Sequence, residues 1–232
     1  MPIYQLSEEI SFPKPELASP DGLLAIGGDL SPERLLFAYE CGIFPWYGDD
    51  EPILWWSPDP RFVLFPEKLK ISKSMRQVLR RGDFTITFDK AFPAVIEACA
   101  AIHRPGQPGT WITEEMKEAY IRLHDLGFAH SVETWQGDEL VGGLYGISLG
   151  NAFFGESMFA KTSNASKTAF ITMVQRLEAK GFELIDCQTP TQHLGSLGAE
   201  RILRDDFLRL LGETMQKDTL RGNWGKVMCA GD

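Results

Sequence analysis

The segment between Ala129 and Gln188 carries the pattern that most constrains the fold of this chain. Three consecutive stretches in it show strand signals separated by short turns, at 129–135, 139–148 and 151–159. A helical stretch follows, which starts near Ser163 or Asn164 and ends before Gly181. The period-2 segment 182–188 is then expected to be a further strand. Elements in this order favour an α/β (α+β) fold, in which a mixed sheet has helices on both faces.

The order strand–strand–helix–strand, after an earlier helix, looks like that of the acyltransferase superfamily of acetyl-CoA N-acetyltransferases. Such a fold alone would not give the substrate.

Prolines crowd the first third of the chain, and such a segment is expected to be rich in loops and short elements. One helix in it is well marked, because Ser31 is a good N-cap, Pro32 suits the first helical position and Gly42 can end the helix. The chain is therefore expected to divide near the string WWSPDPR into a small N-terminal domain, residues 1–60, and a larger acyltransferase-like catalytic domain, residues 61–232.

Three more helices are predicted from caps and apolar spacing. They run from Ser72 to Gly82, from Glu114 to Leu126 with Thr113 as N-cap, and from Asp205 to Met215.

The charge of the chain is unevenly distributed. Its net charge is −9, which argues against a protein that coats nucleic acid and is compatible with a cationic substrate. The stretch from Lys68 to Arg81 nevertheless holds six basic residues and no acidic one. Four of them lie on the second predicted helix: Lys73, Arg76, Arg80 and Arg81. This face is either a solvated helix surface, with its last arginines favoured by the helix dipole, or a phosphate-binding patch.

Several classes of protein are not expected from this sequence. No stretch approaches the roughly 18 apolar residues of a membrane span, and the first residues lack the features of a signal peptide. Four scattered cysteines indicate reduced thiols in the cytoplasm, and the four histidines show no metal-ligand spacing. We therefore expect no metal and, because no apolar heptad is present, a monomer.

Seven strings carry a resemblance to a known family: GLLAIGGDLSPERLLFAYECGIFPW, ILWWSPDPR, GTWIT, LVGGLYG, FFGESMF, NASKTA and LIDCQ. In this order the chain resembles the leucyl/phenylalanyl-tRNA–protein transferase family. The resemblance implies a cofactor-free enzyme that moves Leu or Phe, and less readily Met, from aminoacyl-tRNA to the α-amine of proteins that begin with Arg or Lys. It also implies that these proteins are marked for degradation.

Asp186 and Gln188 are the residues that the resemblance places at the acceptor amine. Two residues apart on a strand, they would share one face about 7 Å apart, and a hydrogen bond between their side chains is feasible. One role for Asp186 is to accept the proton of the amine, with Gln188 orienting the carboxylate. An aspartate in water, with a pKa of about 3.9, is poorly matched to base catalysis near pH 7. We therefore expect Asp186 to be an anchor for the ammonium group and a weak base.

Glu156 lies in a very apolar strand, where an unpaired charge is costly. The period of the strand predicts that Phe154, Glu156 and Met158 share one face. The resemblance places Glu156 beside the 3′-terminal adenosine of the tRNA, together with Trp46 and Trp111. Indole rings suit that role because an aromatic side chain can stack on a base.

The resemblance also supplies an apolar pocket for the amino-acid side chain and a tRNA-binding helix. The pocket residues carried over are Leu144, Gly155, Met158, Phe170, Met173, Leu177 and Ile185. The helical spacing of Phe170, Met173 and Leu177 is equally typical of an ordinary core. The basic helix with Lys73, Arg76, Arg80 and Arg81 matches the family region that holds the acceptor arm, which favours the phosphate-binding interpretation.

Two other functions compete with this interpretation. An acyl-CoA N-acyltransferase of the same fold needs a glycine-rich loop for the CoA pyrophosphate, and the string AKTSNASKTA at the comparable place contains no glycine. A non-catalytic tRNA-binding module would leave Asp186, Gln188 and Glu156 as structural residues.

Overall fold

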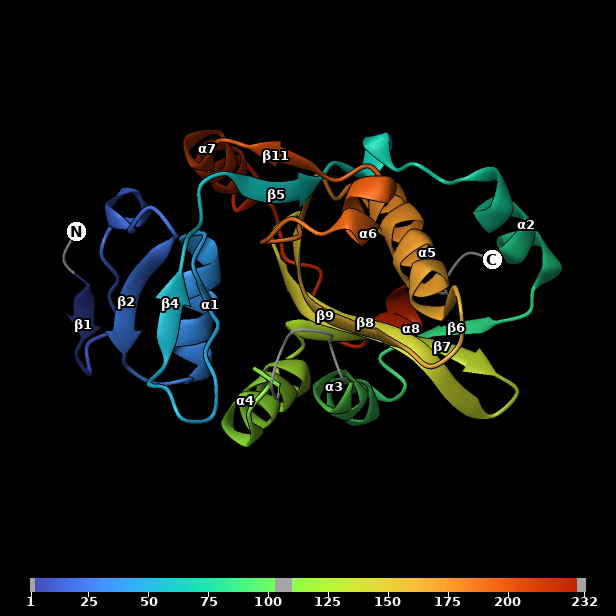
Figure 1. Cartoon of the computed structure of the whole chain (residues 1–232), viewed down its shortest axis with the longest axis horizontal. Coiled ribbons are helices and arrows are strands. Elements are labelled where there is room, and N and C mark those ends of the chain that lie inside the picture. The colour runs from blue at the N-terminus through green and yellow to red at the C-terminus, as the bar shows by residue number, and fades with distance from the viewer. Residues whose placement is uncertain (1–2, 103–109, 229–232) are drawn as a thin grey trace.

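The computed structural model describes residues 3–102 and 110–228, which form two mixed sheets with helices packed on them (Figure 1). The first sheet has the strand order β1-β2-β4-β3. Its strands are β1 (Tyr4–Leu6), β2 (Leu23–Gly27), β3 (Phe44–Pro45) and β4 (Leu54–Trp56). β1 runs parallel to β2, and the other neighbours are antiparallel.

The second sheet has the strand order β11-β5-β10-β9-β8-β7-β6. Its strands are β5 (Arg61–Leu64), β6 (Thr85–Phe88), β7 (Ala129–Gln136), β8 (Glu139–Leu149), β9 (Ala152–Ala160), β10 (Leu184–Asp186) and β11 (Glu200–Ile202). β9 and β10 are parallel, whereas the other neighbouring strands of this sheet are antiparallel.

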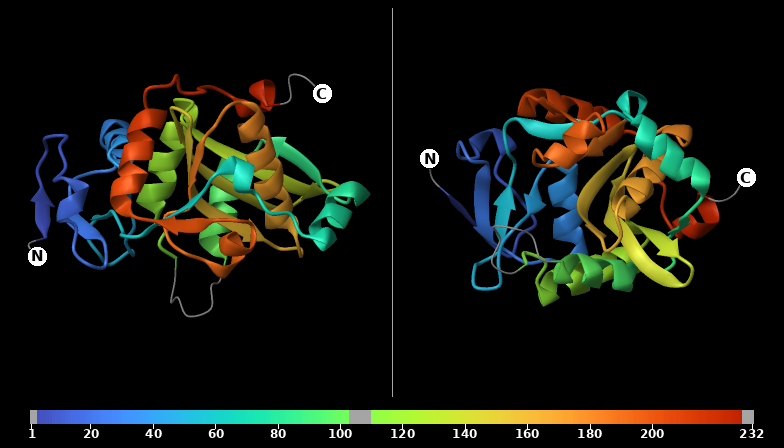
Figure 2. Two further views of the ribbon diagram at one scale, coloured as in Figure 1. Left: turned by 90° about the horizontal axis from the view of Figure 1, so that it is seen from above. Right: turned by 45° about the vertical axis from the view of Figure 1, so that its right-hand side comes forward.

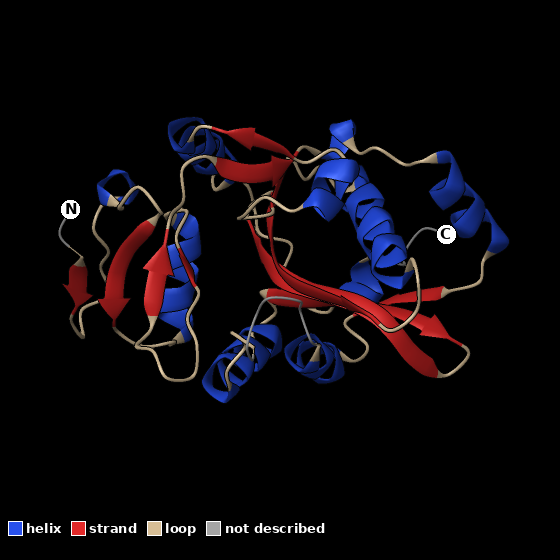
Figure 3. Cartoon of the chain, in the orientation of Figure 1, coloured by secondary structure: helices blue, strands red, loops and turns tan. Residues whose placement is uncertain are grey.

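Helices cover both faces of the second sheet (Figure 3). α3 (Phe92–Ala101) and α4 (Glu114–Asp125) pack on one face, and α5 (Ala165–Ala179) and α8 (Trp224–Val227) on the other. The remaining helices are α1 (Pro32–Glu40), α2 (Lys73–Arg81), α6 (Gln192–Ser196), α7 (Arg204–Thr214) and the 3-10 turns Pro15–Leu17 and Pro66–Lys68. The predicted mixed sheet with flanking helices is therefore confirmed.

Three of the predicted helix starts, those of α1, α2 and α4, are confirmed by capping contacts. The side chains of Ser31, Ser72 and Thr113 each accept a hydrogen bond from the backbone N–H three residues further on. Gly82 ends α2 in the left-handed region, with φ of 67°, a conformation that glycine adopts without strain.

The two sheets share one hydrophobic core. Residues of the N-terminal segment, such as Leu35 and Trp55, belong to the same buried cluster as Phe92 and Tyr145 of the larger sheet. The N-terminal sheet and α2 nevertheless lie at opposite ends of the molecule (Figure 2). The division of the chain at residue 60 stays a prediction.

Candidate active site

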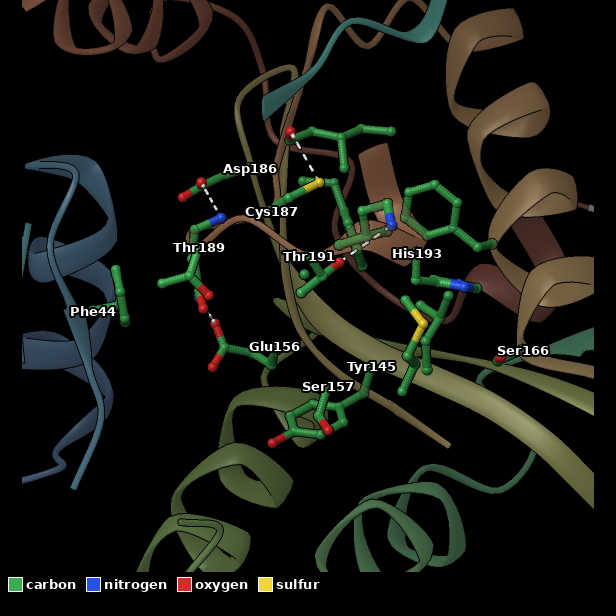
Figure 4. Close-up of a pocket in the computed structure, with 18 of the residues that line it drawn as sticks. Phe44, Tyr145, Glu156, Ser157, Ser166, Asp186, Cys187, Thr189, Thr191 and His193 are labelled. Carbon is green, nitrogen blue, oxygen red and sulfur yellow. Dashed lines mark hydrogen bonds between the residues drawn. The ribbon is translucent and has the colours of Figure 1, made fainter. Parts of the chain in front are cut away.

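A cavity of about 470 Å³ opens between α5, the strands β8 to β10 and the N-terminal segment (Figure 4). Among the residues that line it are eleven of the predicted site residues: Trp46, Trp111, Leu144, Gly155, Glu156, Met158, Phe170, Met173, Ile185, Asp186 and Gln188. Leu177 is not among the lining residues, because it is fully buried in the core on another part of α5. The four predicted tRNA-binding residues of α2 also lie apart from the cavity lining.

The cavity forms where two parallel strands separate. β9 and β10 pair as far as Phe154 and Asp186, where β10 ends. Two residues later Gln188 adopts a left-handed conformation with φ of 59°. The prediction of a regular strand through Gln188 is therefore wrong at its last residues. Asp186 belongs to β10 but Gln188 does not, so the strand rule that places residues two apart on one face does not apply to this pair.

A β-bulge in β9 brings Glu156 to this point. In the pairing with β8, Ser157 lies opposite Tyr145 and Gly155 lies opposite Gly146, so Glu156 is the extra residue of the bulge. Gly146 is required there, since a Cβ atom on it would lie 2.2 Å from the carbonyl oxygen of Phe154.

The bulge shifts the alternation of the side chains by one residue. Phe154 packs in the cluster with α3 and α4, whereas Met158 packs in the cluster with α5. The prediction that Phe154, Glu156 and Met158 share one face is therefore wrong.

Glu156 is buried and accepts hydrogen bonds from three side chains. Its Oε1 accepts from the Tyr39 hydroxyl at 2.7 Å and from the Gln188 amide nitrogen at 2.8 Å. Its Oε2 accepts from the Tyr120 hydroxyl at 3.0 Å. Burial and, as a smaller effect, the negative charge of Asp186 raise the pKa of Glu156 to about 7, against the lowering effect of these donors.

Asp186 forms a buried ion pair with Arg61. The guanidinium donates to both carboxylate oxygens, at 2.9 Å and 2.6 Å, and both side chains are completely inaccessible to solvent. The rings of Phe44 and Phe207 lie on the guanidinium, with centroids 4.8 Å and 4.6 Å from it. This pair holds Asp186 in a fixed position.

Gln188 connects the two carboxyl groups. Its backbone N–H donates to Asp186 Oδ1 at 2.8 Å, and its side chain donates to Glu156 rather than to Asp186. Gln188 therefore orients Glu156, and Arg61 orients Asp186.

Sequence reasoning missed Arg61, Tyr39 and Tyr120. Arg61 ends the string ILWWSPDPR, so it was visible as part of a motif. The two tyrosines occupy the buried faces of α1 and α4, where an aromatic residue is typical of an ordinary core.

The cavity has an aromatic entrance and an apolar interior. Trp46 is 37% exposed and Trp111 is half-buried. Inside lie the buried side chains of Leu144, Phe170, Met173 and Ile185, and half-buried Met158. The arrangement suits a ligand with an apolar group at one end and a flat ring at the other.

The basic face of α2 is exposed to solvent. Met75 and Val78 are buried, while Lys73, Arg76, Arg80 and Arg81 are exposed. Arg81 pairs with Asp83 at 2.8 Å, which offsets part of its charge. In Figure 1, α5 lies between α2 and the strand β9, and both α5 and β9 contribute residues to the cavity lining.

Comparison with known proteins identifies the family. Residues 28–59 match the N-terminal domain model of leucyl/phenylalanyl-tRNA protein transferase, and residues 63–212 match its main model. The leucyl/phenylalanyl-tRNA–protein transferase of Anaeromyxobacter sp. (strain Fw109-5) is 60% identical over 97% of this chain and 95% of that protein. That of Syntrophus aciditrophicus (strain SB) is 59% identical over 97% of this chain and 94% of that protein.

These matches show that the chain is an enzyme of the aminoacyltransferase class. It belongs to the leucyl/phenylalanyl-tRNA–protein transferase family. The resemblance seen in the sequence is thus confirmed, and with it the expectation of a transferase.

Similarities to solved structures are weaker. An aminoglycoside acetyltransferase from a soil metagenomic sample aligns over 56% of this chain and 88% of its own, with 16% identity and a TM-score of 0.37. L-PGS from Bacillus licheniformis aligns over 74% of this chain and 55% of its own, with 13% identity and a TM-score of 0.40. At these TM-scores the similarities support nothing about substrate or mechanism.

The described residues lack two kinds of feature. None of their helices is both long and apolar enough to cross a membrane. Within residues 3–102 and 110–228, no group of three or more His, Cys, Asp or Glu side chains is arranged to hold a metal ion.

Proposed function

We propose that the enzyme transfers Leu or Phe, and less readily Met, from aminoacyl-tRNA to the α-amine of proteins that begin with Arg or Lys, which marks these proteins for degradation. The family membership supports the class of reaction. The observation that carries the choice of donor is the cavity itself, whose apolar interior suits the branched side chain of Leu, the aromatic ring of Phe or the unbranched thioether of Met.

The proposed donor fits the cavity in one direction. The amino-acid side chain would contact Leu144, Phe170 and Met173, while the terminal adenine would stack near Trp46 and Trp111. The ester bond between them would then lie near the polar side chains of the cavity. Such a pocket discriminates weakly, because one methylene changes the binding free energy by only about 1–3 kcal/mol.

The chemistry requires little activation. The ester is already reactive, and an α-amine with a pKa of roughly 7.7–8.0 is partly neutral at physiological pH. The protein must therefore align the amine and the ester and guide a proton. With its carboxylate paired to Arg61, Asp186 acts by positioning the segment that carries Gln188, and the basic face of α2 would hold the acceptor arm through its phosphates.

The test is transfer of labelled leucine from leucyl-tRNA to a peptide that begins with Arg. We expect label on this peptide, and none on the same peptide with an acetylated N-terminus or with Gly in the first position. Phenylalanyl-tRNA and methionyl-tRNA in parallel reactions give the order of donors. Equal labelling of the Gly peptide would contradict the proposed acceptor, and no labelling of any peptide would contradict the proposed reaction.

A further inference from the structure

Three side chains form a closed triangle of close oxygen contacts beside the cavity. The hydroxyls of Tyr39 and Tyr120 lie 2.5 Å apart, Tyr39 lies 2.7 Å from Oε1 of Glu156, and Tyr120 lies 3.0 Å from its Oε2. Tyr39 comes from α1, Tyr120 from α4 and Glu156 from the bulge in β9. Both tyrosines are fully buried, and Glu156 keeps 8% of its surface exposed on the cavity side.

The number of protons in this triangle indicates the state of Glu156. Each close contact between two of these groups needs one hydrogen, and the two hydroxyls supply only two. If Glu156 were ionised, both hydroxyls would donate to it, and their own oxygens would face each other at 2.5 Å without a hydrogen between them. If Glu156 is protonated, Glu156 donates to Tyr120, Tyr120 donates to Tyr39, and Tyr39 donates back to Glu156.

The surroundings of the triangle point the same way. Burial raises the pKa of Tyr39 and of Tyr120 well above 10, so both remain proton donors. Tyr145 from β8 lies against the ring of Tyr120, and Asp186 on β10 adds a negative charge whose counter-ion is Arg61 on β5. Burial and this charge both disfavour a carboxylate at position 156.

We propose that Tyr39, Tyr120 and Glu156 together hold one transferable proton, which Glu156 gives to the leaving ribose oxygen and regains from the attacking amine. In this step, which rests on the proposed function, the C–N bond forms and the C–O bond of the ester breaks. The amine nitrogen loses one proton and the ribose oxygen gains one, so the triangle returns to its starting state. The transferable proton lies on Glu156 Oε2, because Oε1 already accepts from two side chains, and it leaves its hydrogen bond with Tyr120 when it passes to the ribose oxygen.

The variant Glu156→Gln separates proton transfer from hydrogen bonding. A glutamine oxygen can accept from Tyr39 and Gln188, and its nitrogen can donate to Tyr120, so the variant preserves the contacts of the protonated triangle. We expect an unchanged fold. We also expect a loss of about 100- to 10,000-fold in the rate of a single transfer turnover. A rate within tenfold of the parent would overturn the proposal and leave the triangle a structural feature.

The proton itself is observed by infrared spectroscopy. At pH 6 the parent should show a protonated-carboxyl band that Glu156→Gln lacks, and the band should fade with a midpoint near pH 7. In Tyr120→Phe this midpoint should rise, because the carboxylate loses a hydrogen-bond donor. The transfer rate should fall at high pH as Glu156 loses its proton, and in this variant the pH of that fall should rise together with the midpoint. Tyr4→Phe is the matched control and should leave both unchanged.

The two proposals fail in different ways. Absence of the band at pH 6, or a midpoint near 4, would overturn the inference whether or not the enzyme is active. Absence of transfer by the parent protein, with the band present, would instead contradict the proposed function.

Discussion

Replacing Asp186 by Asn removes the negative half of a fully buried ion pair. Arg61 then keeps its charge between two aromatic rings, with no counter-ion and no access to water. Removing one partner from a pair of this kind typically costs about 3–5 kcal/mol. For a chain of this size the midpoint of thermal unfolding would fall by roughly 6–20 °C.

Urea unfolding at pH 7.5 measures this loss and shows its cause. Arg61→Met should be similarly destabilising, because it leaves a buried carboxylate unpaired. The double variant Arg61→Met/Asp186→Leu should recover most of the stability, since it buries no charge. Glu200→Gln, which breaks the half-exposed pair with Lys68, is the matched control and should cost less than about 1 kcal/mol.

One result would refute this reasoning. If Asp186→Asn unfolds within about 1 kcal/mol of the parent while Glu200→Gln behaves as expected, then the Arg61 pair does not hold this segment. A loss of transfer activity in Asp186→Asn would in that case report on chemistry. With the expected destabilisation, the same loss of activity reports first on the position of the segment that Asp186 anchors.

Three further perturbations test the site and the electrostatics. Reversing the charges of Arg76 and Arg80 should weaken tRNA binding at low salt and reduce the slope of log affinity against log salt by about 1.5; equal affinity at low salt would exclude this helix. Met173→Ala and Leu177→Ala both empty a buried position of α5 and should each cost about 2–5 kcal/mol, but only Met173 lines the cavity. Competition between donors should therefore shift towards Phe in Met173→Ala and stay unchanged in Leu177→Ala, and the opposite result would reverse the two assignments. Because the pKa of Glu156 is raised to about 7 in the folded protein, the stability of the parent relative to Glu156→Gln should be highest below about pH 4 and should fall by about 3 kcal/mol as the pH rises through 7. Urea unfolding of both proteins at pH 5 and pH 8 measures this difference in stability. If the difference is the same at both pH values, Glu156 titrates normally.

Most regular elements could be predicted because their signals are local. The N-caps Ser31, Ser72 and Thr113 act on backbone groups three residues away, so their effect is visible in the sequence. α3 was not predicted, because Ala91 provides no cap. The start of α3 is instead held by Glu133 from β7, distant in sequence, which accepts from the backbone N–H groups of Lys90 and Ala91 just before the helix.

The short strands of the N-terminal segment were not predicted for a similar reason. β1, β3 and β4 have two or three residues each, too few to show a period. These strands are stabilised by hydrogen bonds to a neighbouring strand, and the neighbour comes from a different segment of the chain.

The sequence by itself determined five of the helices (α1, α2, α4, α5 and α7), the longer strands, the family and the residue types that surround the cavity. The tertiary structure alone decided how the acidic groups are used. The bulge at Glu156 and the end of β10 at Asp186 depend on how β8, β9 and β10 separate. Asp186 is paired because Arg61 enters from β5, and Glu156 meets two hydroxyls because α1 and α4 converge on it. The protonation state of a buried carboxyl depends on such neighbours in space, and those neighbours are far apart in the sequence.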